Sequence, residues 1–242
     1  MKIVDLTLAT PEENLACDEA LLDECDGREG MEVLRFWQPR QYFVAVGYSN
    51  QVEREVNVAA CRERGVPVLR RCSGGGAVLQ GPGCLNYSLV LRMDSNAALE
   101  TVTGTNRFVM ERNRAALEHL LERRVHVEGF TDLAMDGRKF SGNAQRRKRR
   151  AILFHGSFLM NFDFSLASQL LPMPSKQPDY RQSRSHGEFL RNMEASAEDV
   201  KLALRRAWQA DELLTDPPLA TTQALVDQKY SAQEWNLRIV SK

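Results

Sequence analysis

Several features that mark common classes of protein are missing from this chain. None of its five cysteines, at positions 17, 25, 61, 72 and 84, forms a C-x-x-C pair or a Cys/His cluster at zinc spacing. An odd number of scattered cysteines in 242 residues is typical of reduced thiols, not of a disulfide-stapled secreted domain. No stretch approaches 18 apolar residues, and the N-terminus lacks the apolar core of a signal peptide. We therefore expect a cytoplasmic protein without a membrane partner.

The chain also lacks a charge bias. Lysines plus arginines and aspartates plus glutamates both number 32, so the formal net charge is zero. Global charge therefore names no partner, and we expect no nucleic-acid partner. The composition is 43% hydrophobic and 26% charged, which is ordinary for a soluble globular protein. No internal repeat, low-complexity tract or linker interrupts the sequence, so one sizeable domain is the simplest organisation.

The order of the expected elements favours an α+β fold. Strand patterns cover residues 2–8, 33–39, 42–49 and 85–92, and helical patterns cover 56–63 and 105–124 and dominate after 186. Thr10 and Glu13 form a capping-box pattern with Pro11 at the first position of another helix. Residues 133–145 and 151–162 are expected to pair as a β-hairpin around a basic turn. This succession predicts a single-domain, mixed and mostly antiparallel sheet with packed helices, with its strands mostly in meanders and hairpins rather than in βαβ units.

A run of three glycines stands out in "LRRCSGGGAVLQGPGCLNYSLVLR", residues 69–92. It does not fit a Walker loop, which needs a lysine and Ser/Thr, or a dinucleotide fingerprint, because Leu79 occupies the place of the third glycine. The remaining functional interpretation is a turn whose exposed amides cradle an anion, with Arg70 and Arg71 supplying charge. A tight turn flanked by solvated arginines accounts for the same residues.

A second stretch, "GRKFSGNAQRRKRRAILFHGSFL" at residues 137–159, places Lys139 before a run of small residues. A lysine in such a setting has room for a ligand and can stabilise developing negative charge, although most lysines are simply solvated. The basic run 146–150 is either a solvated hairpin tip or a patch that steers an acidic partner. His155 alternates with apolar residues, so we expect it on a strand near the wall of a pocket.

Together the two stretches resemble the lipoate-protein ligases and octanoyltransferases of the biotin/lipoate ligase superfamily. "RRCSGGGAV" is similar to the family's R-R-x-S-G-G-G-A-V loop, and "GRKFSGNAQ" to its G-x-K-x-S-G-x-A-Q stretch. "PEENLACDEALL" and "ALVDQKYSAQEWN" resemble its N-terminal and C-terminal helices, so the likeness spans nearly the whole chain. The resemblance implies the biotin/lipoate ligase (class II synthetase-like) fold. It also implies one catalytic domain over residues 1–242, without the C-terminal accessory domain of larger ligases.

The implied function is attachment of lipoate to a lysine of an apo lipoyl domain or of the glycine-cleavage H protein. ATP and Mg²⁺ would activate lipoate as lipoyl-AMP, and a separate small accessory protein would replace the missing domain. Lys139 would hold the reacting centre, between the acyl carbonyl and the α-phosphate. The nucleotide and acyl group would be bound by Arg71, Ser73, Gly74, Gly75, Gly76, Ala77, Val78, Leu79, Gly142, Asn143 and Ala144. No protein-built metal site is implied.

Two departures from the family pattern leave alternatives open. Gln80 stands where the ligases usually have histidine, and Cys84 stands where asparagine is usual. One alternative is an octanoyl- or lipoyltransferase that takes its acyl group from acyl carrier protein through a Cys84 thioester, with Lys139 assisting. Related transferases carry their cysteine elsewhere, and a buried structural cysteine is also common. A third alternative is a non-catalytic lipoate-binding module. Lipoate and octanoate are not distinguished, because both are apolar chains of similar width.

The segment 178–190, "PDYRQSRSHGEFL", is polar and begins with proline. We expect a surface loop leading into a helix, with a mobile lid over the acyl site as the alternative.

Overall fold

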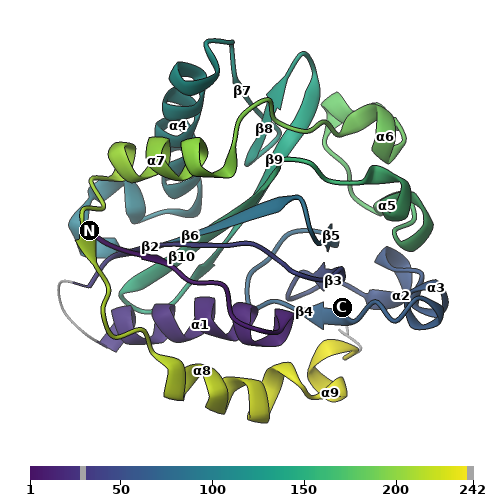
Figure 1. Cartoon of the computed structure of the whole chain (residues 1–242), viewed down its shortest axis with the longest axis horizontal. Helices are drawn as coiled ribbons and strands as arrows, with labels where there is room; N and C mark the ends of the chain where they lie inside the picture. Colours follow the sequence, from purple (N-terminus) through teal and green to yellow (C-terminus); the bar gives the residue numbers. More distant parts are fainter. Residues whose placement is uncertain (28–30, 239–242) are drawn as a thin grey trace.

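The architecture is a large mixed sheet with helices on both faces (Figure 1). The structure is a computed structural model and describes residues 1–27 and 31–238. Within these residues the strand order of the main sheet is β11-β1-β2-β6-β10-β9-β8-β7, and that of a smaller sheet is β4-β3-β5. The strands of the main sheet are β1 (Lys2–Asp5), β2 (Val33–Trp37), β6 (Cys84–Arg92), β7 (His126–Glu128), β8 (Asp132–Met135), β9 (Arg138–Arg147), β10 (Ala151–Leu159) and β11 (Glu212–Leu213). The smaller sheet contains β3 (Phe43–Val46), β4 (Val68–Arg70) and β5 (Val78–Gln80).

Four helices form the outer layers. Helices α4 (Val102–Leu121) and α7 (Ala197–Trp208) cover one face of the main sheet, and α1 (Pro11–Gly27), with α8 (Leu219–Leu225) packed against it, covers the other (Figure 1). The other helices in the described part of the chain are α2 (Val52–Glu55), α3 (Val58–Glu63), α5 (Phe164–Leu170), α6 (His186–Phe189), α9 (Gln233–Asn236), η1 (Met93–Ser95), η2 (Ala97–Leu99), η3 (Asp179–Arg181) and η4 (Val226–Tyr230). In the described part of the chain, no helix combines the length and apolar character needed to cross a membrane.

Alternation along the strands builds a core on each side of the sheet. On β2, Leu34 and Phe36 are fully buried in the cluster that includes residues of α4 and α7. The intervening Arg35 is equally buried but is held beneath α1 by a 2.6 Å bond from Nη1 to Asp18 Oδ1. Because strand side chains alternate between faces, one strand supplies apolar residues to one core and a buried ion pair to the other.

The capping box predicted for α1 is confirmed. The Thr10 amide donates to Glu13 Oε2 at 2.8 Å, and the Glu13 amide donates to Thr10 Oγ1 at 3.2 Å. These reciprocal bonds satisfy donors at the N-terminus of a helix that would otherwise lack partners. The helix then buries Leu21 and Leu22 against the sheet, which fixes the position of Asp18 one turn earlier.

The strands lie mostly in antiparallel meanders and hairpins, as predicted, and two connections are exceptions. β1 and β2 are adjacent and parallel with α1 between them, and β3 and β4 are adjacent and parallel with α2 and α3 between them. A helix between two strands carries the chain back to the starting end of the sheet, so that the second strand runs parallel to the first. The predicted hairpin of β9 and β10 is confirmed, and β8 joins the same antiparallel meander. The sheet is therefore mixed, with mostly antiparallel neighbours, as predicted.

Element boundaries differ from the predictions by a few residues. The helix predicted at 105–124 spans Val102–Leu121, because Thr101 accepts a bond from the Gly104 amide at its start and Glu122 adopts a φ of 49° at its end. The strands predicted at 2–8, 33–39 and 42–49 are shorter. Helical structure does dominate after residue 186, although β11 adds a short strand beside β1.

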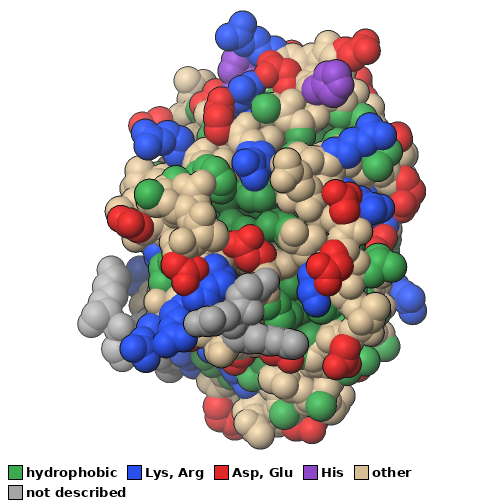
Figure 2. All heavy atoms as spheres, turned by 90° about the vertical axis from the view of Figure 1, so that its left-hand side faces the viewer, with side chains coloured by type: hydrophobic (Ala, Val, Ile, Leu, Met, Phe, Trp, Pro, Cys, Tyr) green, Lys and Arg blue, Asp and Glu red, His purple; other side chains and the backbone are tan. Residues whose placement is uncertain are grey.

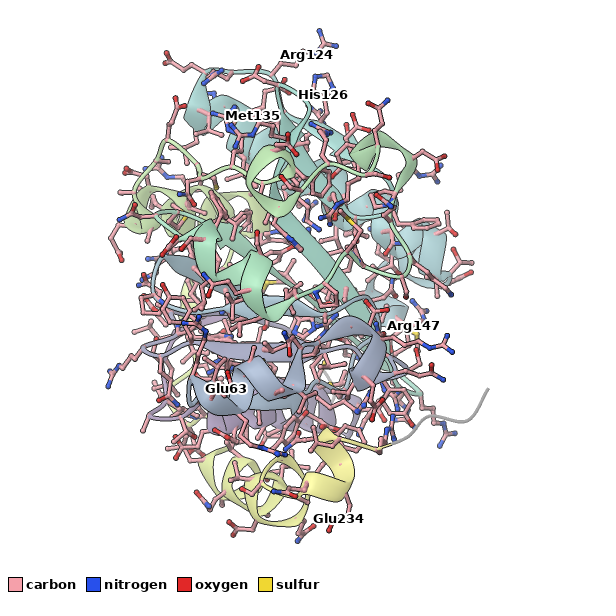
Figure 3. The ribbon with its side chains drawn as sticks, turned by 90° about the vertical axis from the view of Figure 1, so that its right-hand side faces the viewer. Glu63, Arg124, His126, Met135, Arg147 and Glu234 are labelled. Carbon is pink, nitrogen blue, oxygen red and sulfur yellow. The ribbon has the colours of Figure 1, made fainter. Side chains whose placement is uncertain are left out.

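The surface mixes charges of both signs. Figure 2 shows Lys and Arg side chains interspersed with Asp and Glu on one face of the molecule, in keeping with the zero net charge. His126 on β7 and Glu234 on α9 lie at opposite ends of the molecule (Figure 3).

Candidate active site

A cavity of about 840 Å³ brings the glycine loop and the Lys139 stretch together. Its lining includes these predicted site residues: Arg71, Gly75, Gly76, Ala77, Val78, Leu79, Cys84, Lys139, Gly142, Asn143 and Ala144. Ser73 and Gly74 are not part of the lining. The two stretches meet because β9 and β10 run beneath the loop that joins β4 to β5. The volume is within the range of small-molecule and cofactor sites.

Arg71 determines the shape of the glycine loop. Its Nη2 donates to the carbonyls of Gly74 at 2.7 Å and Gly76 at 2.8 Å, and its Nη1 donates to Ala45 O at 3.0 Å. Burial lowers the pKa of the guanidinium to about 10, so it stays charged at neutral pH. Arg71 thus donates to carbonyls of its own loop and of β3, and its Nε donates to the Ser73 hydroxyl.

The clamped carbonyls fix the direction of the neighbouring amides. In a trans peptide the C=O and N–H point in opposite directions, so the amides of Gly75 and Ala77 point away from the Arg71 guanidinium. In the described part of the chain these two amides donate to no protein acceptor. Gly75 has a φ of 88°, a conformation that favours glycine, and a Cβ there would lie 2.8 Å from Arg71 Nη2. The loop thus presents unpaired donors beside the cavity, as an anion cradle requires.

Lys139 lies on β9, as expected, and forms an ion pair. Its Nζ is 2.8 Å from Asp132 Oδ1 at the start of β8. The ammonium passes over Gly142, where a Cβ would lie 2.6 Å from Nζ and 2.7 Å from Cε. The absence of a side chain at Gly142 therefore leaves the space that the end of the Lys139 side chain occupies.

Asp132 was not predicted from the sequence. The sequence signal that could have located it is the Asp136–Gly137 dipeptide, because Asp-Gly indicates a tight hairpin turn between two strands. Both residues do have positive φ values in the structure. The turn makes β8 and β9 neighbours, and an irregularity of register at Leu133/Ala134 brings Asp132 opposite Gly142.

The segment 178–190 forms one wall of the cavity. Tyr180 Oη donates to Asp132 Oδ2 at 2.8 Å, and the Arg191 amide donates to Lys139 O at 2.9 Å. Burial, followed by the charge of Asp132, raises the pKa of the Tyr180 hydroxyl, which keeps it a donor. The segment does lead into a helix, α6, as expected, and it is also part of the site.

A buried polar chain supports the glycine loop from behind. His155 Nδ1 lies 3.2 Å from Asp18 Oδ2, and His155 Nε2 lies 2.5 Å from Ser73 Oγ. Burial opposes ionisation of Asp18, but Arg35 and His155 together outweigh it and hold the pKa of that carboxyl below its usual value. Asp, His and Ser in this order also occur in hydrolases.

In this chain, Ser73 is fully buried, accepts a 3.1 Å bond from Arg71 Nε and does not line the cavity. A nucleophile must reach its substrate, so we assign the Asp–His–Ser chain to support of the loop. The predicted place of His155, on a strand at the pocket wall, is confirmed.

The environment of Cys84 does not favour a nucleophile. Burial raises the pKa of its thiol to about 12, and its side chain is 1% exposed. Reactive cysteines have a lowered pKa and a nearby cationic group or base. Cys84 instead belongs to an apolar cluster with Leu79, Phe162 and Leu171.

Part of the basic run 146–150, predicted as a solvated hairpin tip or a patch that steers a partner, forms hydrogen bonds and an ion pair within the protein. Arg147 donates to Leu99 O and Glu100 O, Lys148 pairs with Asp23, and Arg149 and Arg150 are exposed. This turn lies nine residues along β9 from Lys139, roughly 30 Å in an extended strand. The turn is thus well separated from Lys139 along the strand.

Metal ligands are sparse around the cavity. Among residues 1–27 and 31–238, no group of three or more His, Cys, Asp or Glu side chains is arranged to hold a metal ion. A magnesium ion at this site would therefore depend on water and on phosphate oxygens of the nucleotide for most of its ligands.

Solved structures of lipoate ligases have the same fold. A bi-partite lipoate-protein ligase from Thermoplasma acidophilum, described with its E2 lipoyl domain, superposes with a TM-score of 0.82 at 25% identity, covering 100% of this chain and 98% of that one. A lipoate-protein ligase A bound with ATP gives a TM-score of 0.81 at 26% identity, covering 98% and 99% of the two chains. The lipoate-ligase fold expected from the resemblance is confirmed.

Curated relatives carry two kinds of name. A lipoate-protein ligase A homologue from Aeropyrum pernix is 32% identical over 88% of this chain and 76% of its own. Lipoate-protein ligase A subunit 1 from Thermoplasma acidophilum is 27% identical over 95% and 93%. Octanoyltransferase LipM from Geobacillus kaustophilus is 26% identical over 98% of both. The model of the lipoyl protein ligase A/B catalytic domain matches residues 10–207, and the chain is an enzyme that belongs to this family.

Proposed function

We propose that this chain attaches lipoate to a lysine of a lipoyl domain by way of a lipoyl-adenylate. The observation that carries the proposal is the convergence of two features in one cavity: the Lys139 ammonium and the unpaired amides of the glycine loop. Fixed donors of this kind stabilise the charge that develops on phosphate and acyl oxygens. Lipoic acid and ATP are each bound in structures of similar ligases.

In the first step, the lipoate carboxylate attacks the α-phosphate of ATP and pyrophosphate leaves. Lys139 would neutralise the oxygens of the reacting phosphate and carboxylate, while the amides of Gly75 and Ala77 would hold the nucleotide phosphate. Arg71 would act through the loop that it clamps. Magnesium, entering with ATP, would shield the charge of the triphosphate.

The acyl chain would lie along the apolar part of the cavity. Leu15, Trp37, Phe43 and Leu79 line this part and are all buried. Burying an apolar chain there stabilises the complex by about 0.8 kcal/mol for each methylene. This lining accommodates lipoate and octanoate alike.

In the second step, the amine of an acceptor lysine attacks the acyl carbonyl and AMP leaves. We propose a lipoyl domain or the glycine-cleavage H protein as the acceptor, and a separate small accessory protein as a partner. The Thermoplasma acidophilum ligase is described as bi-partite and was studied with an E2 lipoyl domain. This chain matches subunit 1 over nearly the full length of both, which supports a similar division of labour and a single catalytic domain over residues 1–242.

Octanoyl transfer is the second candidate, supported by the names of several relatives. In that reaction Cys84 would accept the acyl group from acyl carrier protein as a thioester. Burial raises the pKa of the Cys84 thiol, and because the thiolate is the nucleophilic form, this environment opposes the route. A non-catalytic lipoate-binding module ranks third, because Lys139 and the anion cradle would then have no task.

Mass spectrometry of three parallel reactions tests the proposal. The chain is incubated with an apo lipoyl domain and either lipoate, ATP and Mg²⁺, or these plus a candidate accessory protein, or octanoyl-acyl carrier protein alone. Lipoyl-adenylate and a lipoylated domain in the first or second reaction support the ligase. An octanoyl adduct of the chain in the third reaction alone would replace it with the transferase.

A further inference from the structure

We propose that Asp132 receives the incoming lysine amine of the acceptor and accepts its proton as the acyl group is transferred. This inference rests on the proposed function and assigns a residue to its second step. Lys139 and the amides of the glycine loop account for binding of an anionic acyl-adenylate. The acceptor lysine, in contrast, arrives as an ammonium cation and must lose two protons to form the amide. A carboxylate beside the reacting centre meets both needs.

The first argument is position. Asp132 lies at the start of β8 with Oδ1 2.8 Å from Lys139 Nζ, the group that holds the reacting centre in the proposed mechanism. Its side chain is 15% exposed, so it is accessible from the cavity without lying free in solvent. A group that touches Lys139 and faces the cavity is within reach of a nucleophile that attacks a carbonyl held by Lys139.

The second argument is orientation. Asp132 Oδ2 accepts a 2.8 Å bond from Tyr180 Oη, so both carboxylate oxygens are held by different elements. Each oxygen retains a further lone pair, because a carboxylate offers about four acceptor positions. A fixed carboxylate can therefore take an additional N–H donor without first breaking either bond. The ammonium of Lys139 likewise has three donors and can hold Asp132 and a phosphate oxygen together.

The third argument comes from the other acidic groups in the lining, which are Asp18, Glu55, Glu128 and Asp179. Asp18 is bonded to Arg35 and His155, and Glu55 accepts a hydrogen bond from Ser175. In the described part of the chain, neither Glu128 nor Asp179 forms an ion pair with Lys139. Among the described residues, Lys139 forms its ion pair with Asp132. Of the carboxylates around the cavity, Asp132 is thus the one already in contact with the proposed reacting centre.

The chemistry balances without an added reactant. One proton of the acceptor ammonium passes to solvent or to Asp132 before attack, since a lysine amine has a pKa of about 10.4 in water. The nitrogen lone pair forms the C–N bond, the C–O bond to the phosphate breaks, and AMP departs with that electron pair. The second proton leaves the nitrogen for the Asp132 carboxylate, which returns it to solvent. General-base assistance of this kind contributes typically about 10²–10⁴-fold.

The test separates transfer from activation. Lipoyl-adenylate is supplied to the full chain with an apo lipoyl domain, and the single-turnover rate of lipoylation is measured from pH 6 to 10. The variant is Asp132→Asn, which keeps the size of the side chain and an acceptor for Tyr180. Asp136→Asn, an exposed aspartate in the turn of the same hairpin, is the matched control. Lipoate activation by ATP and hydroxamate formation with hydroxylamine, an uncharged amine at neutral pH, are measured in parallel.

We expect Asp132→Asn to slow lipoylation by at least 100-fold at pH 7. The difference in rate between the variant and the unaltered chain should decrease as the pH approaches the pKa of the acceptor lysine, about 10.4. Activation and hydroxamate formation should fall by less than tenfold, and Asp136→Asn should behave as the unaltered chain. Equal losses in activation, hydroxamate formation and lipoylation at every pH would overturn the inference, because Asp132 would then only orient Lys139. Wild-type lipoylation that does not exceed the uncatalysed rate would instead overturn the proposed function itself.

Discussion

Replacing Gly142 with alanine should remove activity while leaving the fold intact. A Cβ at this position would lie 2.6 Å from Lys139 Nζ and 2.7 Å from Cε. Ordinary contact begins near 3.4 Å, so the ammonium must retreat by about 0.8 Å. The obstructing atoms are the far end of a flexible side chain, and Gly142 does not have a positive φ. A displacement of roughly 1 Å at a reacting centre can reduce the rate about 10²-fold.

The assays are lipoylation of an apo lipoyl domain from supplied lipoyl-adenylate, and thermal unfolding of the same preparations. Gly142→Ala should lose about 100-fold in activity and change the free energy of unfolding by less than about 1 kcal/mol. Gly156→Ala is an informative contrast, because its Cβ would overlap Asn143 and crowd the backbone oxygen of Gly142, so stability and activity should both fall. Full activity in Gly142→Ala would refute the placement of Lys139 at the reacting centre.

Three further predictions follow from other parts of the site. Phe130→Ala, which removes an aromatic side chain that is 90% exposed at the cavity, should raise KM for the acceptor domain severalfold and leave activation of lipoate unchanged; a selective loss of activation would contradict it. Cys84 should resist iodoacetamide in the folded chain at pH 8, because burial raises its pKa to about 12, and rapid alkylation would revive the thioester route. Asp18→Asn should lower the free energy of unfolding in urea by about 3–5 kcal/mol at pH 7, because it leaves the buried Arg35 unpaired. The pKa of Asp18 is lowered in the fold, so this contribution is complete above about pH 3.9 and is lost as the pH falls through the lowered value; a difference unchanged down to pH 2 would contradict the pairing.

The two stretches that resemble the family pattern could be located in the sequence because each is short and continuous. The three glycines and Lys139 lie in short stretches whose meaning does not depend on distant parts of the chain, and both stretches line the cavity. Thr10 and Glu13 are equally local, and their capping box is present.

Residues that act through long-range pairing could not be identified in the same way. Asp18 and His155 are 137 positions apart and meet because α1 packs across β10. Tyr180 reaches Asp132 from a separate segment. The sequence shows that Arg71 carries charge, but only the structure shows that its guanidinium clamps the loop carbonyls. Parallel pairing of β1 and β2 was missed for a related reason, since the path of a connecting helix is a property of packing.

The central claim is that Lys139 and the glycine loop hold an acyl-adenylate for transfer to a lysine. Transfer from supplied lipoyl-adenylate to an apo lipoyl domain tests it most directly, because no accessory protein is needed to make the adenylate. The account predicts rapid lipoylation by the unaltered chain and a loss of at least 100-fold in Lys139→Ala, with similar unfolding temperatures. Equal rates in the two proteins, or no rate above that of the uncatalysed reaction, would contradict it.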